Sequence, residues 1–172
     1  MVKMQSNKPL DQKNDQTTVY TIGHSNFRFE RFLNLLNSNG IEVLVDIRSI
    51  PFSKYAPQFN KDTIKMKLED AGIEYLHLGD KLGGKPKNTE IRYEVIEKSE
   101  EYIEGISTLI KLSGKKKTVI MCSEENPDKC HRHHLIAQTL LRRGAVVFHI
   151  RGNGTTERAK KENVQLTLDS IL

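Results

Sequence analysis

Tryptophan is absent from this chain, cysteine occurs only twice, and no apolar run approaches the ~18 residues that a membrane-spanning helix needs. Two cysteines exclude a disulfide-rich secreted scaffold. The first residues are polar and lack the apolar stretch of a signal peptide, so we expect a reducing, cytoplasmic setting and no membrane partner. What is left is a globular protein of 172 residues, a length that suits one domain with its own core.

The charge balance is only weakly informative. There are 27 basic and 22 acidic residues, which leaves a net charge of +5. A small surplus spread along the chain is more typical of a solvated surface than of a nucleic-acid footprint, in which the charges cluster. Nucleic acid is therefore the alternative partner rather than the first choice. The lysines that would contact it are Lys54, Lys81, Lys85, Lys87, Lys115, Lys116 and Lys117.

Apolar periodicity predicts one α/β domain. We expect a flexible polar tail over residues 1–16 and a single domain over 17–172. Alternating strand and helix patterns favour right-handed crossovers, and hence a three-layer sandwich with a mainly parallel sheet of about five strands in unknown order. The strand-like runs are 19–22, 43–47, 73–78, 118–121 and 145–150. The helical patterns cover about 26–39, 63–71, 90–112 and 130–143, with a last helix expected over 162–171.

Unusual polar residues follow four of the predicted strands. Parallel strands end at one edge of a sheet, so the residues that follow them share a crevice. The convergence of several such segments, rather than any single residue, predicts a ligand site at that edge. The segments are 23–26, 46–49, 79–84 and 122–124.

Cys130 is the candidate nucleophile. It lies in the first turn of a predicted helix, where backbone N–H groups favour a thiolate, and Arg132 follows two residues later. Cys122 ends the preceding strand, so the two thiols form a redox pair in an alternative interpretation. Zinc bound by Cys130 and His134 is another alternative, although the spacing matches no usual zinc motif. Both thiols could also be inert buried side chains. We predict no metal site and leave the cofactor open.

Arg48 and Arg132 are candidate anion ligands, because a guanidinium offers five planar donors to a phosphate or carboxylate. Arg48 ends an apolar strand together with Asp46, and charges in that position must be paired or must face a ligand. We expect ligand contact, with an ion pair between Asp46 and Arg48 as the alternative. Asp46 and Glu124 are candidates for proton transfer. Glu124 could instead pair with Arg132 or Lys129.

His24 and Ser25 follow Gly23 directly, so a sharp turn can direct an imidazole and a hydroxyl into the same crevice. N–H groups at the start of the next helix suit an anion there. Ser25 could instead simply cap that helix. Gly83 and Gly84 lie between lysines in a loop whose backbone donors can wrap an anion, although this loop is not a standard phosphate-binding motif.

Five ordered motifs between residues 19 and 150 resemble the domain of unknown function 488 family. They are 21–25, 45–51, 57–60, 75–79 with 82–84, and 122–124 with 130–132. The resemblance implies an α/β domain of soluble prokaryotic proteins and assigns no reaction. It supports one shared site at His24, Asp46, Arg48, Cys122, Glu124, Cys130, His131 and Arg132.

We therefore predict a small cytoplasmic enzyme that acts on an anionic substrate, a nucleotide or another phosphorylated metabolite. The alternatives are a nucleic-acid-binding accessory protein and a thiol-based redox or metal sensor that uses Cys122 and Cys130. The oligomeric state is open. The catalytic candidates are His24, Asp46, Glu124 and Cys130, and the substrate-binding candidates are Ser25, Arg48, Gly83, Gly84, Cys122, His131 and Arg132.

Overall fold

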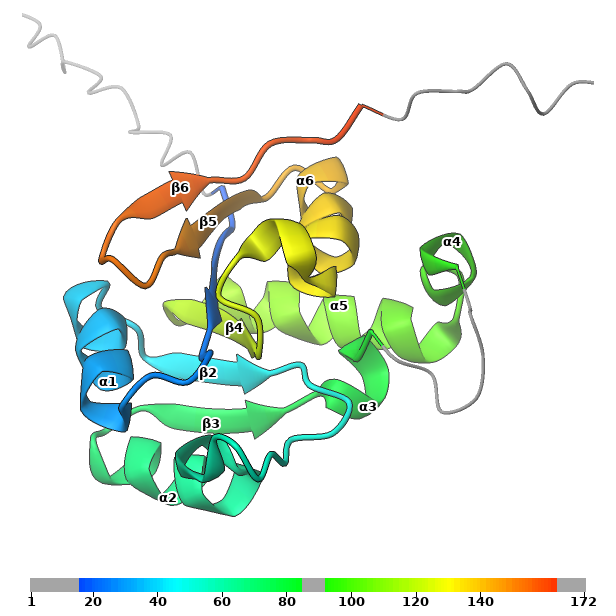
Figure 1. Cartoon of the computed structure of the whole chain (residues 1–172). Coiled ribbons are helices and arrows are strands. Elements are labelled where there is room, and N and C mark those ends of the chain that lie inside the picture. Colours follow the sequence, from blue (N-terminus) through cyan, green and yellow to red (C-terminus); the bar gives the residue numbers. More distant parts are fainter. Residues whose placement is uncertain (1–15, 85–91, 164–172) are drawn as a thin grey trace, which may run out of the picture.

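Parallel strands dominate the sheet at the centre of the molecule. The computed structural model describes residues 16–84 and 92–163, within which six strands form one sheet in the order β3-β2-β4-β1-β5-β6 (Figure 1). All neighbouring pairs are parallel except β5 and β6. The predicted mainly parallel α/β sheet is thus confirmed. The strands are β1 (Thr18–Gly23), β2 (Val43–Asp46), β3 (Glu74–His77), β4 (Thr118–Cys122), β5 (Val146–Ile150) and β6 (Thr156–Arg158).

Helices cover both faces of the sheet. Figure 1 shows α1 and α2 on one side and α5 and α6 on the other. A π-helix, Arg132–Ala137, runs directly into α6, and short 3-10 turns lie at Pro57–Phe59 and Pro127–Lys129. The α-helices are α1 (Phe29–Ser38), α2 (Lys61–Asp70), α3 (Gly79–Leu82), α4 (Tyr93–Ile96), α5 (Glu100–Ser113) and α6 (Gln138–Arg142).

Alternating side chains of the central strands enter two separate cores, one on each face of the sheet. Val43 and Val45 of β2 belong to the core that α5 and α6 cover, whereas Leu44 belongs to the core under α1 and α2. All three side chains are fully buried, which explains why β2 is a continuous apolar run in the sequence. Burying a side chain of this size stabilises the fold by about 1.5–3 kcal/mol. The sheet is therefore the middle layer of a three-layer sandwich.

Three elements differ from the sequence prediction. β6 is an additional, antiparallel strand whose three residues are all exposed, so no apolar pattern marks it. α3 occupies the predicted loop after β3, where the buried side chain of Leu82 anchors it. The helix predicted over 90–112 includes the separate helices α4 and α5, because the Ser99 hydroxyl caps α5 by accepting a hydrogen bond from the Tyr102 N–H (3.3 Å).

Some predictions fall outside the described residues. These are residues 1–15 of the tail, residues 164–171 of the last helix, and Lys85 and Lys87. Within the two described ranges, no helix combines the length and the apolar character that crossing a bilayer requires.

Candidate functional site

A pocket of about 450 Å³ opens where the carboxyl ends of β2 and β4 meet α4 and the start of the π-helix. Six of the predicted site residues line it: Arg48, Gly84, Cys122, Glu124, Cys130 and His131. The other five, His24, Ser25, Asp46, Gly83 and Arg132, do not. Ser49, Ile50, Tyr93, Ser123 and Lys129 complete the lining. The shared crevice expected from the strand ends is present, but only part of the predicted set faces it.

Two sulfur atoms and one imidazole meet in this pocket. The Nδ1 atom of His131 lies 3.7 Å from the Sγ atom of Cys122 and 3.9 Å from that of Cys130. The opposite ring nitrogen, Nε2, lies 3.1 Å from the carbonyl oxygen of Leu82. A carbonyl only accepts, so Nε2 carries the proton and donates it. Nδ1 is consequently the ring nitrogen that faces the two sulfur atoms.

The pKa values of the two thiols are shifted in opposite directions. A hydrogen bond from the Cys122 thiol, together with the contact to His131 and the charge of Arg132, lowers the pKa of Cys130 against the opposing effect of burial. The same hydrogen bond and burial raise the pKa of Cys122. The backbone N–H of Arg132 also donates to the Cys130 sulfur (3.5 Å). Of the two thiols, Cys130 is therefore the one whose thiolate is favoured.

Arg132 follows Cys130 by two residues and is fully buried. Its Nε donates to the Thr21 hydroxyl (3.2 Å), its Nη2 to the carbonyl of Glu125 (2.7 Å) and its Nη1 to the carbonyl of Glu124. Across residues 16–84 and 92–163, no carboxylate lies within ion-pairing distance of it. This geometry does not favour the expected direct contact between Arg132 and a substrate, because its guanidinium donates to protein groups and does not line the pocket. The charge of Arg132 therefore influences the pocket electrostatically, by favouring the anionic form of Cys130.

Arg48 forms a buried ion pair with Asp46, which was the alternative interpretation. Its Nε and Nη2 donate to the two carboxylate oxygens (2.9 and 2.7 Å), and Nη2 also donates to the carbonyl of Phe59 (2.8 Å). The Tyr75 hydroxyl donates to the same carboxylate (2.6 Å). Asp46 is thus saturated and away from the pocket, so this geometry opposes its role in proton transfer. Arg48 reaches the pocket wall with most of its donors already used.

His24 supports Arg48 rather than facing the pocket. Its Nδ1–H donates to the carbonyl of Ser25 (2.7 Å), so Nε2 accepts from Nη1 of Arg48 (3.1 Å). Burial, reinforced by the charge of Arg48, lowers the pKa of His24 to about 4. Its ring stacks on Phe59 with centroids 4.5 Å apart. The lone pair that a general base needs is therefore engaged in the protein.

Ser25 does not cap the following helix, which begins at Phe29 after Arg28. It is exposed, with a positive φ of 46°, and its N–H donates to the carbonyl of Ser123 (2.8 Å). The neighbouring Gly23 allows this close approach of two strand ends. A Cβ atom at Gly23 would lie 1.7 Å from the carbonyl oxygen of Glu124. The motif around Gly23 hence fixes the loop after β4 in place.

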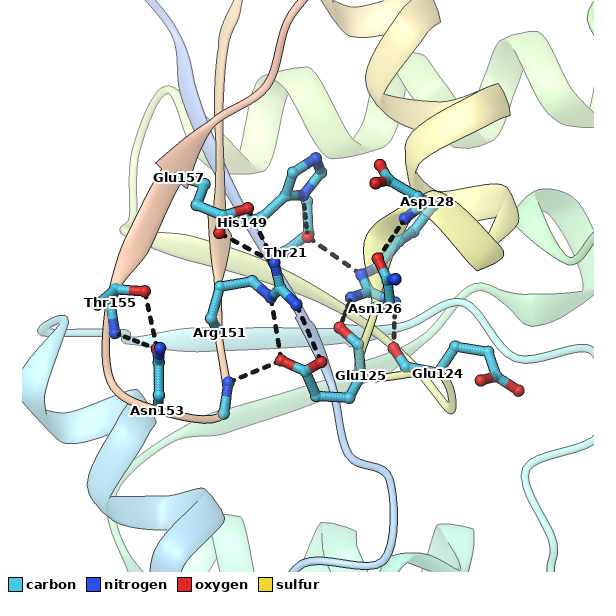
Figure 2. A network of polar contacts seen from close by, with 12 residues as sticks. Thr21, Glu124, Glu125, Asn126, Asp128, His149, Arg151, Asn153, Thr155 and Glu157 are labelled. Atoms are coloured by element: carbon cyan, nitrogen blue, oxygen red, sulfur yellow. Dashed lines mark hydrogen bonds and ion pairs between the residues drawn. The ribbon is translucent and has the colours of Figure 1, made fainter.

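Glu124 and Lys129 supply the exposed charges of the pocket. Figure 2 shows the Glu124 carboxylate directed away from the surrounding network, and it has no partner within the described part of the chain. Tyr93 of α4, which sequence reasoning missed, also lines the pocket. It follows no strand, so the strand-end argument could not find it. Lys129 was considered only as a partner for a glutamate.

Glu125, by contrast, is committed to structure. Figure 2 shows Arg151 between Glu125 and Glu157. Arg151 donates to both oxygens of Glu125 (3.0 and 3.1 Å) and also to Glu157. The hydrogen bonds that Glu125 accepts from Arg151 and from the N–H of Gly152 lower its pKa. This network ties the loop after β4 to the β5–β6 hairpin. It thereby positions the two carbonyls that receive Arg132.

Gly83 and Gly84 allow close packing. A Cβ atom at Gly83 would lie 2.1 Å from the Ser49 hydroxyl oxygen, and one at Gly84 would lie 2.5 Å from Cγ of His131. Only Gly84 borders the pocket. The absence of side chains here lets α3 and the segment after it press against His131 and Ser49, and this accounts for the two glycines without an anion-wrapping loop.

The zinc pair considered from the sequence, Cys130 with His134, does not form. His134 lies on the π-helix and its Nδ1 approaches the Glu162 carboxylate (2.5 Å), while its Nε2 donates to the Asp128 carbonyl (2.7 Å). His131 takes its place next to the sulfurs. The regular α-helix on which the i, i+4 argument depended is absent at this point.

The lysines considered for nucleic acid that fall within the described residues do not gather in one place. Lys54 and Lys81 follow the carboxyl ends of β2 and β3, whereas Lys115, Lys116 and Lys117 precede the amino end of β4 and line a hollow of about 590 Å³ there. Two of them are in ion pairs, Lys81 with Glu104 and Lys116 with Glu74. Nucleic-acid binding stays a prediction that this distribution does not favour.

Comparison with known proteins gives one match. Neither curated proteins nor solved structures yield a similarity to this chain. A family model does, over residues 28–139, which is well over half of the chain and includes the sulfur–imidazole cluster but not His24. The predicted resemblance is confirmed: the chain belongs to the family described as domain of unknown function DUF488.

Proposed function

We propose that the protein is a small cytoplasmic enzyme in which the Cys130 thiolate attacks a small anionic substrate, a nucleotide or another phosphorylated metabolite. One observation carries the proposal: the pocket-lining sulfur of Cys130 accepts from the backbone N–H of Arg132, whose fully buried guanidinium has no carboxylate partner among the described residues and favours the thiolate. A buried positive charge of this kind favours an anion near it. The reducing cytoplasm would keep both thiols in the form that the chemistry needs.

The pocket suits a small ligand. Its volume of about 450 Å³ lies within the usual range of ligand sites, ~300–1,000 Å³. Lys129 is exposed at its rim, where it can pair with a phosphate, and the field of Arg132 adds to this attraction. Direct bidentate recognition by Arg48 or Arg132 is not part of the proposal, because their donors bind the protein.

The proposed reaction is hydrolytic. The Cys130 sulfur donates an electron pair to an electrophilic phosphorus or carbon atom, and the bond to the leaving oxygen breaks with its electron pair on that oxygen. Water then displaces the sulfur, which departs again as thiolate. Glu124 accepts the proton of this water and passes it to the departed oxygen. The net change is addition of one water molecule across the cleaved bond.

Thermal-shift screening of nucleotides and sugar phosphates tests the proposal. A true ligand raises the melting temperature of the wild type and of Cys130→Ser, but Cys130→Ser does not turn it over. Lys129→Gln weakens binding by about tenfold, the loss of one charge-assisted contact. Lys115→Gln, at the opposite edge of the sheet, is the matched control and binds as the wild type does. Turnover that survives in Cys130→Ser contradicts the proposal.

A thiol redox switch is the second candidate, favoured by the two sulfur atoms lying within 4.8 Å of each other. Hydrogen peroxide would take two electrons and two protons from the thiols, leaving a disulfide and water. Intact-mass measurement after mild peroxide treatment then shows the loss of two hydrogen atoms, reversed by dithiothreitol. An unchanged mass removes this candidate.

A further inference from the structure

We propose that Cys122, Cys130 and His131 bind Zn²⁺ reversibly and that the bound metal blocks the Cys130 nucleophile. The metal site stands on its own geometry. The blocking step rests on the proposed function, because it assumes that Cys130 is the reacting group.

The three donor atoms already have the spacing of a metal site. The Nδ1 atom of His131 and the two Sγ atoms all lie within 4.8 Å of one another, with N–S distances of 3.7 and 3.9 Å. Tetrahedral zinc with Zn–S bonds of ~2.3 Å and Zn–N bonds of ~2.0 Å holds such atoms about 3.5–3.8 Å apart. An ion can therefore enter with shifts of a few tenths of an ångström at the two N–S contacts and of at most about 1 Å between the sulfur atoms.

The imidazole is held in the orientation that a metal ligand needs. Nε2–H donates to the Leu82 carbonyl, so Nδ1 is the ring nitrogen directed at the sulfurs, and it binds a metal once it carries no proton. Zinc-binding histidines commonly donate the second ring nitrogen to a carbonyl in this way, which fixes both tautomer and ring direction. Gly84 packs against the Cγ and Nδ1 edge of the ring, where a Cβ atom would lie 2.5 Å from Cγ and 2.9 Å from Nδ1. The ring thus has little freedom to turn away.

The donor set determines the class of metal. Two thiolates and one imidazole favour zinc and other thiophilic ions over Mg²⁺ or Ca²⁺, which prefer oxygen. Three protein ligands leave a fourth position open, and all three residues line the same pocket. That position is available to water or to an anion, so a bound metal would occupy the place from which the sulfur attacks. The absence of a common zinc spacing in the sequence is explained by the loop over 123–129, which Arg132 and Arg151 hold in place.

A second cluster serves as the internal control. His133, His134 and Glu162 also bring three donor atoms within 4.8 Å. Here, however, the carboxylate of Glu162 pairs directly with the imidazoles, at 2.5 Å from Nδ1 of His134 and 3.3 Å from Nε2 of His133. An ion pair accounts for this contact without a metal. The cluster also contains no sulfur, so the two sites give different spectra.

Cobalt titration of the reduced, chelator-treated full-length protein tests the metal site. The expected result is one Co²⁺ per chain with an intense near-ultraviolet sulfur-to-cobalt charge-transfer band, which added Zn²⁺ removes. The chain has only two cysteines, so the band in the wild type is itself diagnostic of thiolate ligation. Cys122→Ser abolishes it, His131→Ala weakens binding at least about tenfold, and Glu162→Gln leaves it intact. No band in the wild type, or a band lost in Glu162→Gln alone, overturns the site.

The alkylation rate of Cys130, followed by mass spectrometry with iodoacetamide, tests the blocking step. Saturating Zn²⁺ is expected to slow the reaction at least tenfold, and a chelator restores it. A cobalt band accompanied by unchanged alkylation overturns blocking but keeps the site. Alkylation of the metal-free protein no faster than that of glutathione contradicts the proposed nucleophile instead. The two failures are therefore distinguishable.

Discussion

Arg48 and Arg132 are two buried guanidiniums at the same edge of the sheet, and they differ in what neutralises them. Arg48 lies against the carboxylate of Asp46 at 2.7 Å, whereas Arg132 contacts carbonyls, a hydroxyl and the sulfur-bearing turn of Cys130. The charge of Arg48 is thus neutralised by a carboxylate, whereas no carboxylate in the described residues neutralises that of Arg132. We call the part of the site after β2, with Asp46 and Arg48, its structural half. The part after β4, with Cys130 and Arg132, is its chemical half.

Each arginine also has a neutral histidine nearby. His24 contacts Arg48 directly, and His149 is linked to Arg132 through Thr21. Burial and the charge of Arg48 lower the pKa of His24 to about 4, and burial, His133 and Arg132 lower that of His149 to about 4. Thr21 links the second pair: it accepts from Arg132 and so donates its hydroxyl proton to Nδ1 of His149 (2.6 Å). In both halves an arginine donates to an uncharged side chain, His24 or Thr21. The two halves differ in that only Arg48 also has a carboxylate partner, Asp46.

The largest expected effect comes from removing the carboxylate that neutralises Arg48. Asp46→Ala leaves Arg48 buried without a counter-charge, and we expect the free energy of unfolding to fall by about 3–5 kcal/mol. The double variant Asp46→Leu with Arg48→Met removes both charges and should recover most of that loss. Urea denaturation of the three proteins measures this. A double variant as unstable as Asp46→Ala would show that hydrogen bonds, not charge, dominate in this half.

Acid should weaken both halves through their histidines. A group whose folded-state pKa is depressed stabilises the fold above its unfolded pKa of ~6.5, and the stability is lost as the pH falls towards the folded value. Between pH 7.5 and pH 5 each histidine should cost about 2 kcal/mol. His149→Gln is expected to lose its own share of this pH dependence and to keep that of His24. Urea denaturation at the two pH values gives the result, and an unchanged slope in His149→Gln would contradict the assignment.

The division into halves shows what the sequence could reveal. Strand ends are visible in a sequence because apolar runs stop there, so the sequence could place the residues around Cys122 and Cys130 at the edge of the sheet, where the structure has them. The partners were not, because they come from distant segments: Thr21 for Arg132, and Tyr75 and Phe59 for Arg48. An arginine in a motif looks the same whether it faces a ligand or a carbonyl.

Local geometry also decided which histidine joins the thiols. An i, i+4 argument selects His134, but the π-helix and the hydrogen bond to Leu82 bring His131 to the sulfurs. The exposed β6 strand and Tyr93 were missed for a related reason, since neither lies in an apolar pattern or at a strand end. Sequence patterns report burial well, and they report side-chain direction only where the helix is regular.

Removing the charge of Arg132 should alter the reactivity of Cys130 more than the stability of the fold. Arg132→Met keeps much of the buried volume but removes the cation near Cys130, so the anionic form of the sulfur loses support. We expect iodoacetamide alkylation at pH 7 to slow at least about tenfold, equivalent to ~1.4 kcal/mol. Arg151→Met, which loosens the same loop without removing the charge near the sulfur, is the control and should change the rate less. Equal slowing in both variants would assign the effect to loop position.

The smallest expected effect isolates the imidazole from the charges. Gly84→Ala places a methyl group 2.5 Å from Cγ and 2.9 Å from Nδ1 of His131, so the ring must leave its present position beside the two sulfurs. Cobalt affinity should fall by about tenfold, the lower end for a residue that orients a ligand, with little change in unfolding free energy. Gly114→Ala is the matched control, because its added Cβ atom would meet only ordinary contacts at 3.6 Å and its φ of −72° is helical. If both variants bind cobalt equally, the ring is held by Leu82 alone, and the close packing of the glycine loop does not contribute to the chemical half of the site.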